Sequence, residues 1–410
     1  MPRISFPWSA WYQDTTHTIE FPSHWTVEQF DLPERRAFGE QEIANALDRP
    51  IESQTLEELS FHVKSACIVV DDLARPTPAS QILPRVIRKL TQRTLRAEDL
   101  KIVIATGTHG KLNEQQIAWK VGQEISHRFD VQCHDCNQEL EGSGIKYGND
   151  ELRINRTFLN SELRIAIGSV LPHSFAGYSG GAKLVLPGLA DVRATSRSHK
   201  FVQLGLRGGS NLEKNRFRTE AEEIVKKIGL DFFIGVSTNS KREIVDLHAG
   251  DVVEAHRTAS AHAKTYFKTQ VDGQYDCLVL NAFPKDVDLI QSENVFVALK
   301  TATKSIVKED GVILVVTAAS EGLGKHGLFQ PGGANYRRPV QKRAFGNREL
   351  WIYSPSVSEA DVRHVYWEGY PFFKDSRSLS LALKKRFPNE CRAAIFTTAP
   401  MQQIVTLESH

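Results

Sequence analysis

Residue types that can transfer protons or bind ligands gather in one short segment, residues 173–199, HSFAGYSGGAKLVLPGLADVRATSRSH. His173 opens the segment and His199 closes it, and an imidazole can exchange a proton or bind a metal near physiological pH. The run Ser179, Gly180, Gly181 stands just before Lys183, where bare backbone N–H groups could cradle an anion. The spacing GxxxxGK[ST] is absent, so this run is not a P-loop.

Two further polar motifs follow short apolar runs of the kind that form buried strands. DDLARPTP (71–78) follows CIVV and contains Asp72 and Arg75, whose guanidinium offers a charged fork for a carboxylate or phosphate. TGTHG (106–110) follows KIVIA and contains His109, and we expect a positive φ at Gly107. A lone histidine is more often structural. Here a glycine lies shortly before His109 and a proline directly before His173, so restricted backbone positions both side chains, which favours a functional role.

The elements that must position these motifs alternate between Val/Ile-rich runs and longer amphipathic segments, which predicts an α/β fold with mainly parallel sheets flanked by helices. We expect strands at 67–70, 101–105, 163–168, 232–236, 277–281, 311–316, 350–353 and 393–397. We expect helices at 80–92, 114–122, 220–229, 253–267 and 289–305, and a further helix that begins near Asp191 and carries His199. Ligands of open parallel sheets bind beyond the carboxyl ends of the strands, so the polar motifs should line one cleft.

The glycine-containing polar stretch at 269–276 predicts a domain boundary, because a new strand–helix alternation follows it. We expect an N-terminal cofactor-binding domain over 1–270 and a C-terminal α/β domain over 277–398 that contributes substrate contacts, with the active site at their junction. The tail 399–410 could return to the first domain.

Composition narrows the class of protein. Lys and Arg total 51 against 49 Asp and Glu, with no long basic run, so we expect no nucleic-acid partner. No apolar run approaches the roughly 18 residues of a membrane span, and the start has no signal-peptide pattern, so we expect a cytoplasmic protein with no membrane contact. Five scattered cysteines predict no disulfide framework, and CHDC (133–136) lacks a second ligand pair for structural zinc.

The motifs taken together resemble the lactate racemase family of nickel-pincer-nucleotide enzymes. The resemblance rests on His173-x₃-Gly177-x-SGG-x-Lys183-x₃-Pro187-Gly188 ending in His199, on DDxxRPTP and on ATGTH, and PKDVDLIQS (284–292) resembles the family's substrate-binding stretch. It implies a 2-hydroxyacid racemase or C2-epimerase that moves a hydride to a pyridinium ring and back, through a 2-keto acid.

The resemblance also implies a role for each matched residue. Lys183 would bind the cofactor covalently through a thioamide, and His199 would ligate its nickel. His109 and His173 would be the two bases. Asp72 and Arg75 would lie against the cofactor and the substrate. The Ser179–Gly181 run would lie against the cofactor. Proteins that synthesise the cofactor would be needed for maturation.

The sequence departs from the family where lactate-specific members have Tyr-Gln-x-x-Lys. It reads Ile290-Gln291-Ser292-Glu293-Asn294, so Gln291 is kept and the lysine is replaced by Asn294. The loss of that cation predicts a 2-hydroxy acid other than lactate, held more by Arg75, with Tyr336 as an aromatic lining residue. Lactate racemase, a zinc hydrolase and a non-catalytic nucleotide- or phosphate-binding protein remain alternatives. Stereochemical preference and oligomeric state do not follow from the sequence.

Overall fold

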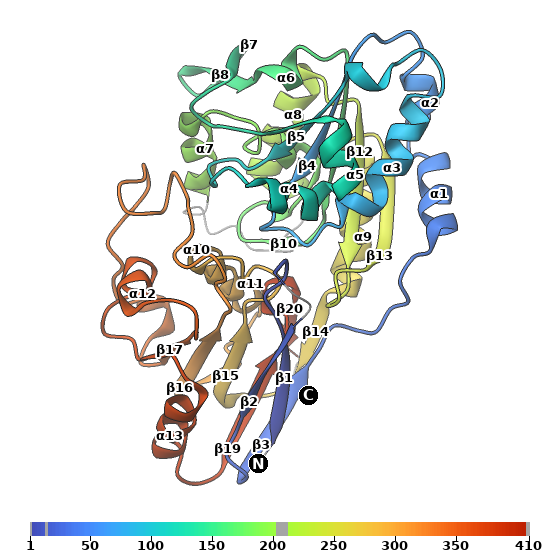
Figure 1. Ribbon diagram of the computed structural model, residues 1–410. Coiled ribbons are helices and arrows are strands. Elements are labelled where there is room, and N and C mark those ends of the chain that lie inside the picture. The colour runs from blue at the N-terminus through green and yellow to red at the C-terminus, as the bar shows by residue number, and fades with distance from the viewer. Residues whose placement is uncertain (1, 13–14, 202–211, 407–410) are drawn as a thin grey trace. The chain divides into compact units, whose positions relative to one another are not determined.

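The computed structural model describes residues 2–12, 15–201 and 212–406, and the chain forms two compact units (Figure 1). One unit comprises residues 34–265. The other comprises residues 1–33 together with 266–410. Each is built on a six-stranded sheet with flanking helices, so the predicted α/β class with mainly parallel sheets is confirmed.

The sheet of the 34–265 unit has the strand order β13-β12-β9-β4-β5-β6. Its strands are β4 (Ala66–Asp71), β5 (Leu100–Ala105), β6 (Asp130–Cys133), β9 (Leu163–Ser169), β12 (Phe232–Thr238) and β13 (Ile244–Gly250). All neighbouring pairs are parallel except β12 and β13. Strands β4, β9 and β12 are buried almost throughout, as expected for parallel strands covered on both faces. Their Val/Ile-rich sequences supply the core of this unit.

Apolar residues of the first five helices of this unit, α1 to α5, join the same core. They are α1 (Glu40–Asp48), α2 (Leu56–Leu59), α3 (Ala79–Leu90), α4 (Glu114–Val121), α5 (Gln123–Arg128), α6 (Arg156–Leu159), α7 (Val192–His199), α8 (Arg216–Ile228) and α9 (Glu254–Tyr266). A hairpin of β7 (Leu140–Tyr147) and β8 (Asp150–Asn155) and a short pair, β10 (Pro172–His173) with β11 (Gly177–Tyr178), complete the unit.

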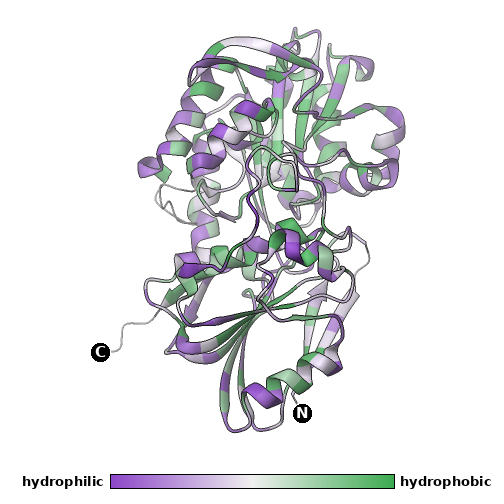
Figure 2. Cartoon of the chain, turned by 90° about the vertical axis from the view of Figure 1, so that its left-hand side faces the viewer, coloured by the Kyte–Doolittle hydropathy of each residue, from purple (hydrophilic) through white to green (hydrophobic). Residues whose placement is uncertain are grey.

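The sheet of the other unit has the order β18-β17-β16-β15-β19-β3 and is parallel throughout. Its strands are β3 (Trp25–Phe30), β15 (Tyr275–Asn281), β16 (Val307–Val316), β17 (Glu349–Tyr353), β18 (Phe372–Phe373) and β19 (Cys391–Phe396). Its helices are α10 (Leu289–Ser292), α11 (Phe296–Thr301), α12 (Glu359–Val365) and α13 (Ser376–Arg386). In Figure 2 the sheet strands are largely hydrophobic, whereas the helices carry both polar and apolar residues.

The N-terminal segment differs from the expected division of the chain at 270–277. Strand β3 pairs with β19, and β1 (Arg3–Trp8) forms a hairpin with β2 (Thr15–Glu20) whose Phe6 and Ile19 pack into the core of the same unit. In the described part of the tail, β20 (Gln403–Thr406) pairs with β14 (Lys268–Val271), and both strands belong to the unit of residues 1–33 and 266–410. These N-terminal strands were not expected from the sequence, and a strand's partner far away in the chain cannot be read from its own residues.

The expected helices are present with bounds that differ by up to four residues, except at 289–305, where a 3₁₀ turn separates α10 from α11. No helix of the described residues has both the length and the apolar character that crossing a membrane requires.

Candidate active site

The loop after β4 is fixed by a buried lysine on α4. The Lys120 ammonium lies 2.6 Å from Asp71 Oδ1 and donates hydrogen bonds to the carbonyl oxygens of Asp72, Arg75 and Thr77 at 3.0, 3.3 and 3.1 Å. Asp71 Oδ2 accepts hydrogen bonds from the Thr77 hydroxyl and from a backbone N–H of β9. Because these contacts satisfy the buried ammonium on several sides, they hold the DDLARPTP loop in one conformation.

Asp72 and His109 form a close pair at the ends of β4 and β5. His109 Nδ1 contacts Asp72 Oδ2, and the other oxygen of Asp72 accepts a hydrogen bond of 3.2 Å from the N–H of Ala74. Burial raises the pKa of Asp72, but the charge and hydrogen bond of His109, with the charges of Arg75 and Lys120, outweigh it and lower the pKa to about 2. Asp72 is therefore ionised at neutral pH and orients the His109 ring.

The backbone before His109 adopts the conformation expected from its glycine. Gly107 has φ +57°, so the predicted positive φ is confirmed. Its N–H donates to the carbonyl of Gly188 at 3.0 Å, and the N–H of His109 donates to Thr106 at 2.9 Å. These bonds tie the loop after β5 to the segment that follows Lys183.

Arg75 is half-buried beside this pair. One of its guanidinium nitrogens donates to the carbonyl of Ala74 at 2.9 Å. Its charge lowers the pKa of both Asp72 and Lys183. The guanidinium therefore lies in the same charged cluster as Asp72 and Lys183, where it could bind an anionic group.

The loop after β9 brings two histidines against one phenylalanine. His173, in β10, accepts a 3.4 Å hydrogen bond at Nδ1 from the N–H of Ala176. The Phe175 ring packs edge-on against His173 and His199, with centroid distances of 4.8 and 5.3 Å. An apolar ring between the two imidazoles keeps both orientations fixed by packing.

The SGG run is packed tightly into the fold. The Ser179 hydroxyl donates to the carbonyl of Ser169 at 2.6 Å and accepts from the N–H of Leu171 at 3.0 Å. Gly180 and Gly181 have φ +79° and +60°, and a Cβ there would lie 3.0 Å from Phe233 or 2.9 Å from His256. These glycines are thus required by backbone conformation and close packing. The contact of Ser179, Gly180 and Gly181 with a cofactor stays a prediction.

Two buried cationic or polar side chains hold this run, and the sequence reasoning missed both. Arg218 on α8 donates to the carbonyls of Gly180 at 2.9 Å, Ala176 at 3.4 Å and Tyr178. His256 Nε2 on α9 donates to the carbonyl of Ser179 at 2.8 Å.

The signal that could have identified these side chains, and Lys120, is a charged or polar residue on the apolar stripe of an amphipathic helix. Lys120 lies three residues after Ile117, and Arg218 lies three residues before the buried Ala221. His256 lies three residues before the buried Ala259. A buried cation has to be satisfied, so such a position predicts a backbone or carboxylate partner.

Lys183 lies in the 3₁₀ turn η2 (Gly181–Leu184), half-buried, next to the charged cluster. Desolvation lowers the pKa of its amine most, the charges of Arg75 and Arg218 lower it further, and Asp72 opposes them, which gives about 7. A lysine with such a pKa is largely unprotonated slightly above neutral pH, and the unprotonated amine is the nucleophilic form.

His199 is the last residue of α7, which begins after Asp191, whose side chain caps the helix by accepting from two N–H groups. The expected helix near Asp191 is therefore confirmed. His199 Nδ1 donates to the carbonyl of Thr195 at 2.8 Å, so in the neutral ring the lone pair is on Nε2. Burial, with the charges of Lys183 and His109, lowers the pKa of His199 to about 4. At neutral pH the ring is in the form that binds metals.

The electrostatic coupling of these groups defines one site in the 34–265 unit. The charge of Lys183 acts on His199, His109 acts on His199 and Asp72, and Asp72 acts on Lys183. The site therefore combines an amine able to form a covalent bond, a neutral imidazole able to ligate a metal, and a carboxylate–imidazole pair able to move a proton.

The predicted substrate residues of the other unit form a polar cluster of their own. Asn294 donates to the backbone carbonyl of Gln291 at 2.8 Å and to Gln291 Oε1 at 3.3 Å. The buried Lys285 donates to Asn294 Oδ1 at 3.1 Å. An ammonium group is thus already present beside position 294, where the lactate-specific members of the resembled family have a lysine. Substrate contact by Gln291 and Asn294 stays a prediction.

Tyr336 is half-buried and lines a surface pocket with Arg338, Arg363, His364 and Glu368. Arg338 is exposed and pairs with Glu368 at 3.1 Å. The role of Tyr336 in lining a substrate pocket also stays a prediction.

Comparison with known proteins relates the chain to lactate racemases. Residues 12–207 match the lactate racemase N-terminal domain family. The lactate racemase of Thermoanaerobacterium thermosaccharolyticum is 26% identical over 339 residues, which are 76% of this chain and 77% of that protein. The lactate racemase of Lactiplantibacillus plantarum is 28% identical over 300 residues, which are 71% of this chain and 69% of that protein.

Solved structures share the fold of the chain. The lactate racemase apoprotein of Thermoanaerobacterium thermosaccharolyticum matches with a TM-score of 0.74 at 21% identity, over 98% of this chain and 100% of that chain. A protein of Thermotoga maritima matches with a TM-score of 0.68 at 16% identity, over 90% of this chain and 99% of that chain.

Proposed function

The chain belongs to the lactate racemase family and is a racemase, and we propose that it inverts C2 of a 2-hydroxy acid by reversible hydride transfer through a 2-keto acid. The observation that carries the proposal is the coupling of a low-pKa Lys183 amine to a neutral His199, beside the Asp72–His109 pair. The chemistry of these groups supports the roles that the family resemblance implies for them.

The residues fit a nickel-pincer nucleotide on chemical grounds. An amine whose pKa is about 7 suits the thioamide bond expected at Lys183. The Nε2 lone pair of His199 suits a nickel ligand, since imidazole and sulfur donors both bind this metal. When bound, the group supplies an electron-poor pyridinium ring that accepts a hydride and returns it. Maturation then requires the proteins that synthesise the cofactor.

The proton of the substrate hydroxyl is handled by this chain's own histidines. His109 donates its Nδ1–H to Asp72, so Nε2 holds the lone pair that accepts the hydroxyl proton as hydride leaves C2. The ionised Asp72 stabilises the imidazolium that results. His173 serves the opposite stereoisomer, and its packing on Phe175 fixes the ring. Two bases are needed because the hydroxyl groups of the two enantiomers point in different directions when each enantiomer is bound.

Arg75 is the group best placed to hold the substrate carboxylate, because it is a permanent cation within the charged cluster. We propose a substrate longer or more hydroxylated than lactate, since Asn294 and Gln291 offer amide groups that hydrogen-bond hydroxyls. The alternative is lactate itself. The curated relatives named as lactate racemases favour that alternative.

The test is an assay of enzyme matured together with the cofactor's biosynthetic proteins, on 2-hydroxy acids that carry deuterium at C2. Hydride transfer through a 2-keto acid returns the deuterium to C2 of the inverted product. Removal of the deuterium on C2 as D⁺, by a base, would instead exchange it with solvent protons. Complete wash-out of the label would overturn the proposed route, and a panel of acids identifies the substrate.

A further inference from the structure

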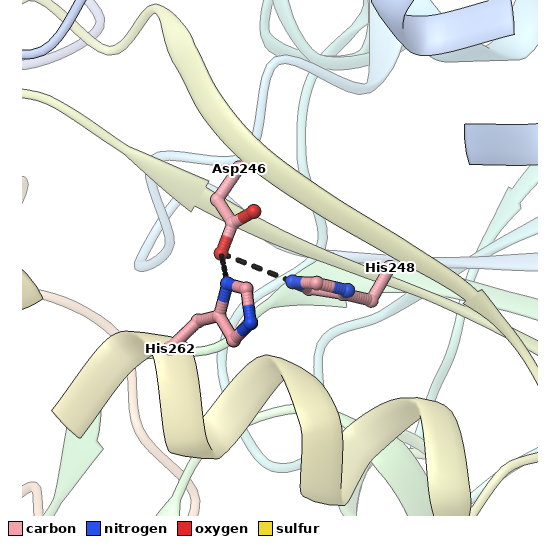
Figure 3. Close-up of side chains that lie close together, drawn as sticks. All are labelled: Asp246, His248 and His262. Carbon is pink, nitrogen blue, oxygen red and sulfur yellow. Dashed lines mark hydrogen bonds and ion pairs between the residues drawn. The ribbon is translucent and has the colours of Figure 1, made fainter. Parts of the chain in front are cut away.

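A second polar cluster lies on β13 and α9, and the proposed function does not use it. It consists of Asp246 and His248 on the strand and His262 on the helix, and Figure 3 shows all three side chains directed at one another. Residues 246 and 248 share one face of β13, because side chains alternate along a strand. His262 faces them from the following helix.

Two ring nitrogens converge on one carboxylate oxygen. His248 Nε2 lies 3.1 Å and His262 Nδ1 lies 3.3 Å from the same atom, Asp246 Oδ2. The two rings meet edge to face with centroids 4.5 Å apart. One ligand atom from each residue lies within 4.8 Å of the other two.

These spacings fit a tetrahedral metal ion. With metal–ligand distances of about 2.0–2.2 Å, two ligands of a tetrahedral ion are separated by roughly 3.3–3.6 Å. The two observed N···O distances are at or slightly below that edge length. An ion could therefore be accommodated by small rotations of the side chains, without movement of the strand or the helix.

The chemistry of the three groups selects the class of ion. Two imidazoles and one carboxylate are the donor set of three-ligand zinc sites, in which water takes the fourth position. Burial raises the pKa of Asp246, but the hydrogen bond and charge of His248, with the charges of His262 and Arg35, hold it below its ordinary value. The carboxylate is thus already ionised, as ligation requires.

An ion from solvent can reach the cluster, and its side chains are available as ligands. The side chain of His262 is 53% exposed, whereas those of Asp246 and His248 are 12% and 15% exposed. Within the described residues, neither imidazole has a side-chain hydrogen-bond partner other than Asp246. The positive charge of Arg35 acts on Asp246 and should weaken the binding of a dication.

We propose that Asp246, His248 and His262 form a binding site for a divalent ion of the zinc class, which fastens α9 to β13. The same helix carries His256, which faces a different side of α9 and holds the carbonyl of Ser179. An ion bound at this cluster would thus stabilise the helix that supports the SGG run. This inference is independent of the proposed racemase activity.

The test is titration of the full chain with zinc chloride, by calorimetry and thermal unfolding, in a His199→Ala background that removes the expected nickel ligand. We expect one equivalent of zinc to bind. A free zinc concentration about a hundred times Kd should raise Tm by about 5–10 °C. His262→Gln should weaken binding at least about tenfold, because it removes one of three ligands.

His127→Gln is the matched control, since His127 is also an exposed helical histidine and lies outside the cluster. Asp246→Asn provides a second ligand variant, and Arg35→Gln should tighten binding. Zinc affinity that is unchanged in both His262→Gln and Asp246→Asn would overturn the proposal, as would the absence of binding to the parent protein.

Discussion

The pairing of Asp72 with His109 yields the sharpest prediction for activity, the effect of Asp72→Asn. The substitution keeps the shape of the side chain but removes the charge that orients the ring and stabilises its protonated form. The pKa of Asp72 is lowered from an ordinary 3.8 to about 2. At about 1.36 kcal/mol per pKa unit, this corresponds to a net interaction of about 2.5 kcal/mol, or roughly 60-fold in a rate.

That interaction is shared with Arg75 and Lys120, while a wrongly oriented His109 would cost much more, up to about 10⁴-fold. We therefore expect kcat/KM to fall at least about tenfold. The equilibrium constant of the reaction is fixed, so kcat/KM must fall by the same factor in both directions. Chiral chromatography of product formed from each stereoisomer measures both.

Intact mass of the same preparations shows whether the variant carries the cofactor, so that a loss of loading is not mistaken for a loss of catalysis. Asp130→Asn is the matched control, because Asp130 is exposed and its carboxylate contacts Lys101 and Gln132 at the surface, away from the Asp72–His109 pair. A fully loaded Asp72→Asn enzyme within about threefold of wild type in both directions would refute the proposed role of the Asp72–His109 pair.

Three further predictions concern stability, specificity and metal binding. Folding lowers the pKa of Lys183, so the folded cofactor-free protein binds fewer protons than the unfolded chain. Its free energy of unfolding should therefore rise as the pH increases from about 7 towards 10.5. Urea unfolding at pH 7 and pH 9 should show this rise, and Lys183→Met should make it smaller. Arg218→Met should lower the free energy of unfolding by about 3–5 kcal/mol, because three backbone carbonyls lose a charged donor; a change under about 1 kcal/mol in urea unfolding would contradict this. Asn294→Lys should change the profile across a panel of 2-hydroxy acids, since it places a second ammonium against Lys285; an identical profile would show that position 294 does not set specificity.

The sequence predicted the central strands because their signal is local. The runs at 67–70, 101–105 and 163–168 consist mostly of Val, Ile and Ala, and each lies within a largely buried strand of the structure. Fixed backbone preferences made Gly107 and the helix after Asp191 predictable in the same way.

What the sequence did not predict depends on contacts between distant residues. That β3 would pair with β19, more than 360 positions later, has no signature in either strand. The clamps formed by Lys120, Arg218 and His256 are equally long-range, and only their place on apolar helix stripes hinted at a structural role. The sequence analysis placed the loops that contain Asp72 and His109 at one cleft, but it did not predict that these two side chains pair with each other.

The measurement that tests the account most directly is the intact mass and metal content of the chain produced with the cofactor's biosynthetic proteins. We expect a covalent adduct that maps to Lys183, with one nickel per chain. The adduct should be absent in Lys183→Ala, and the nickel should be lost in His199→Ala while the adduct remains. An unmodified wild-type chain, made alongside a lactate racemase that does acquire the adduct under the same conditions, would contradict the account.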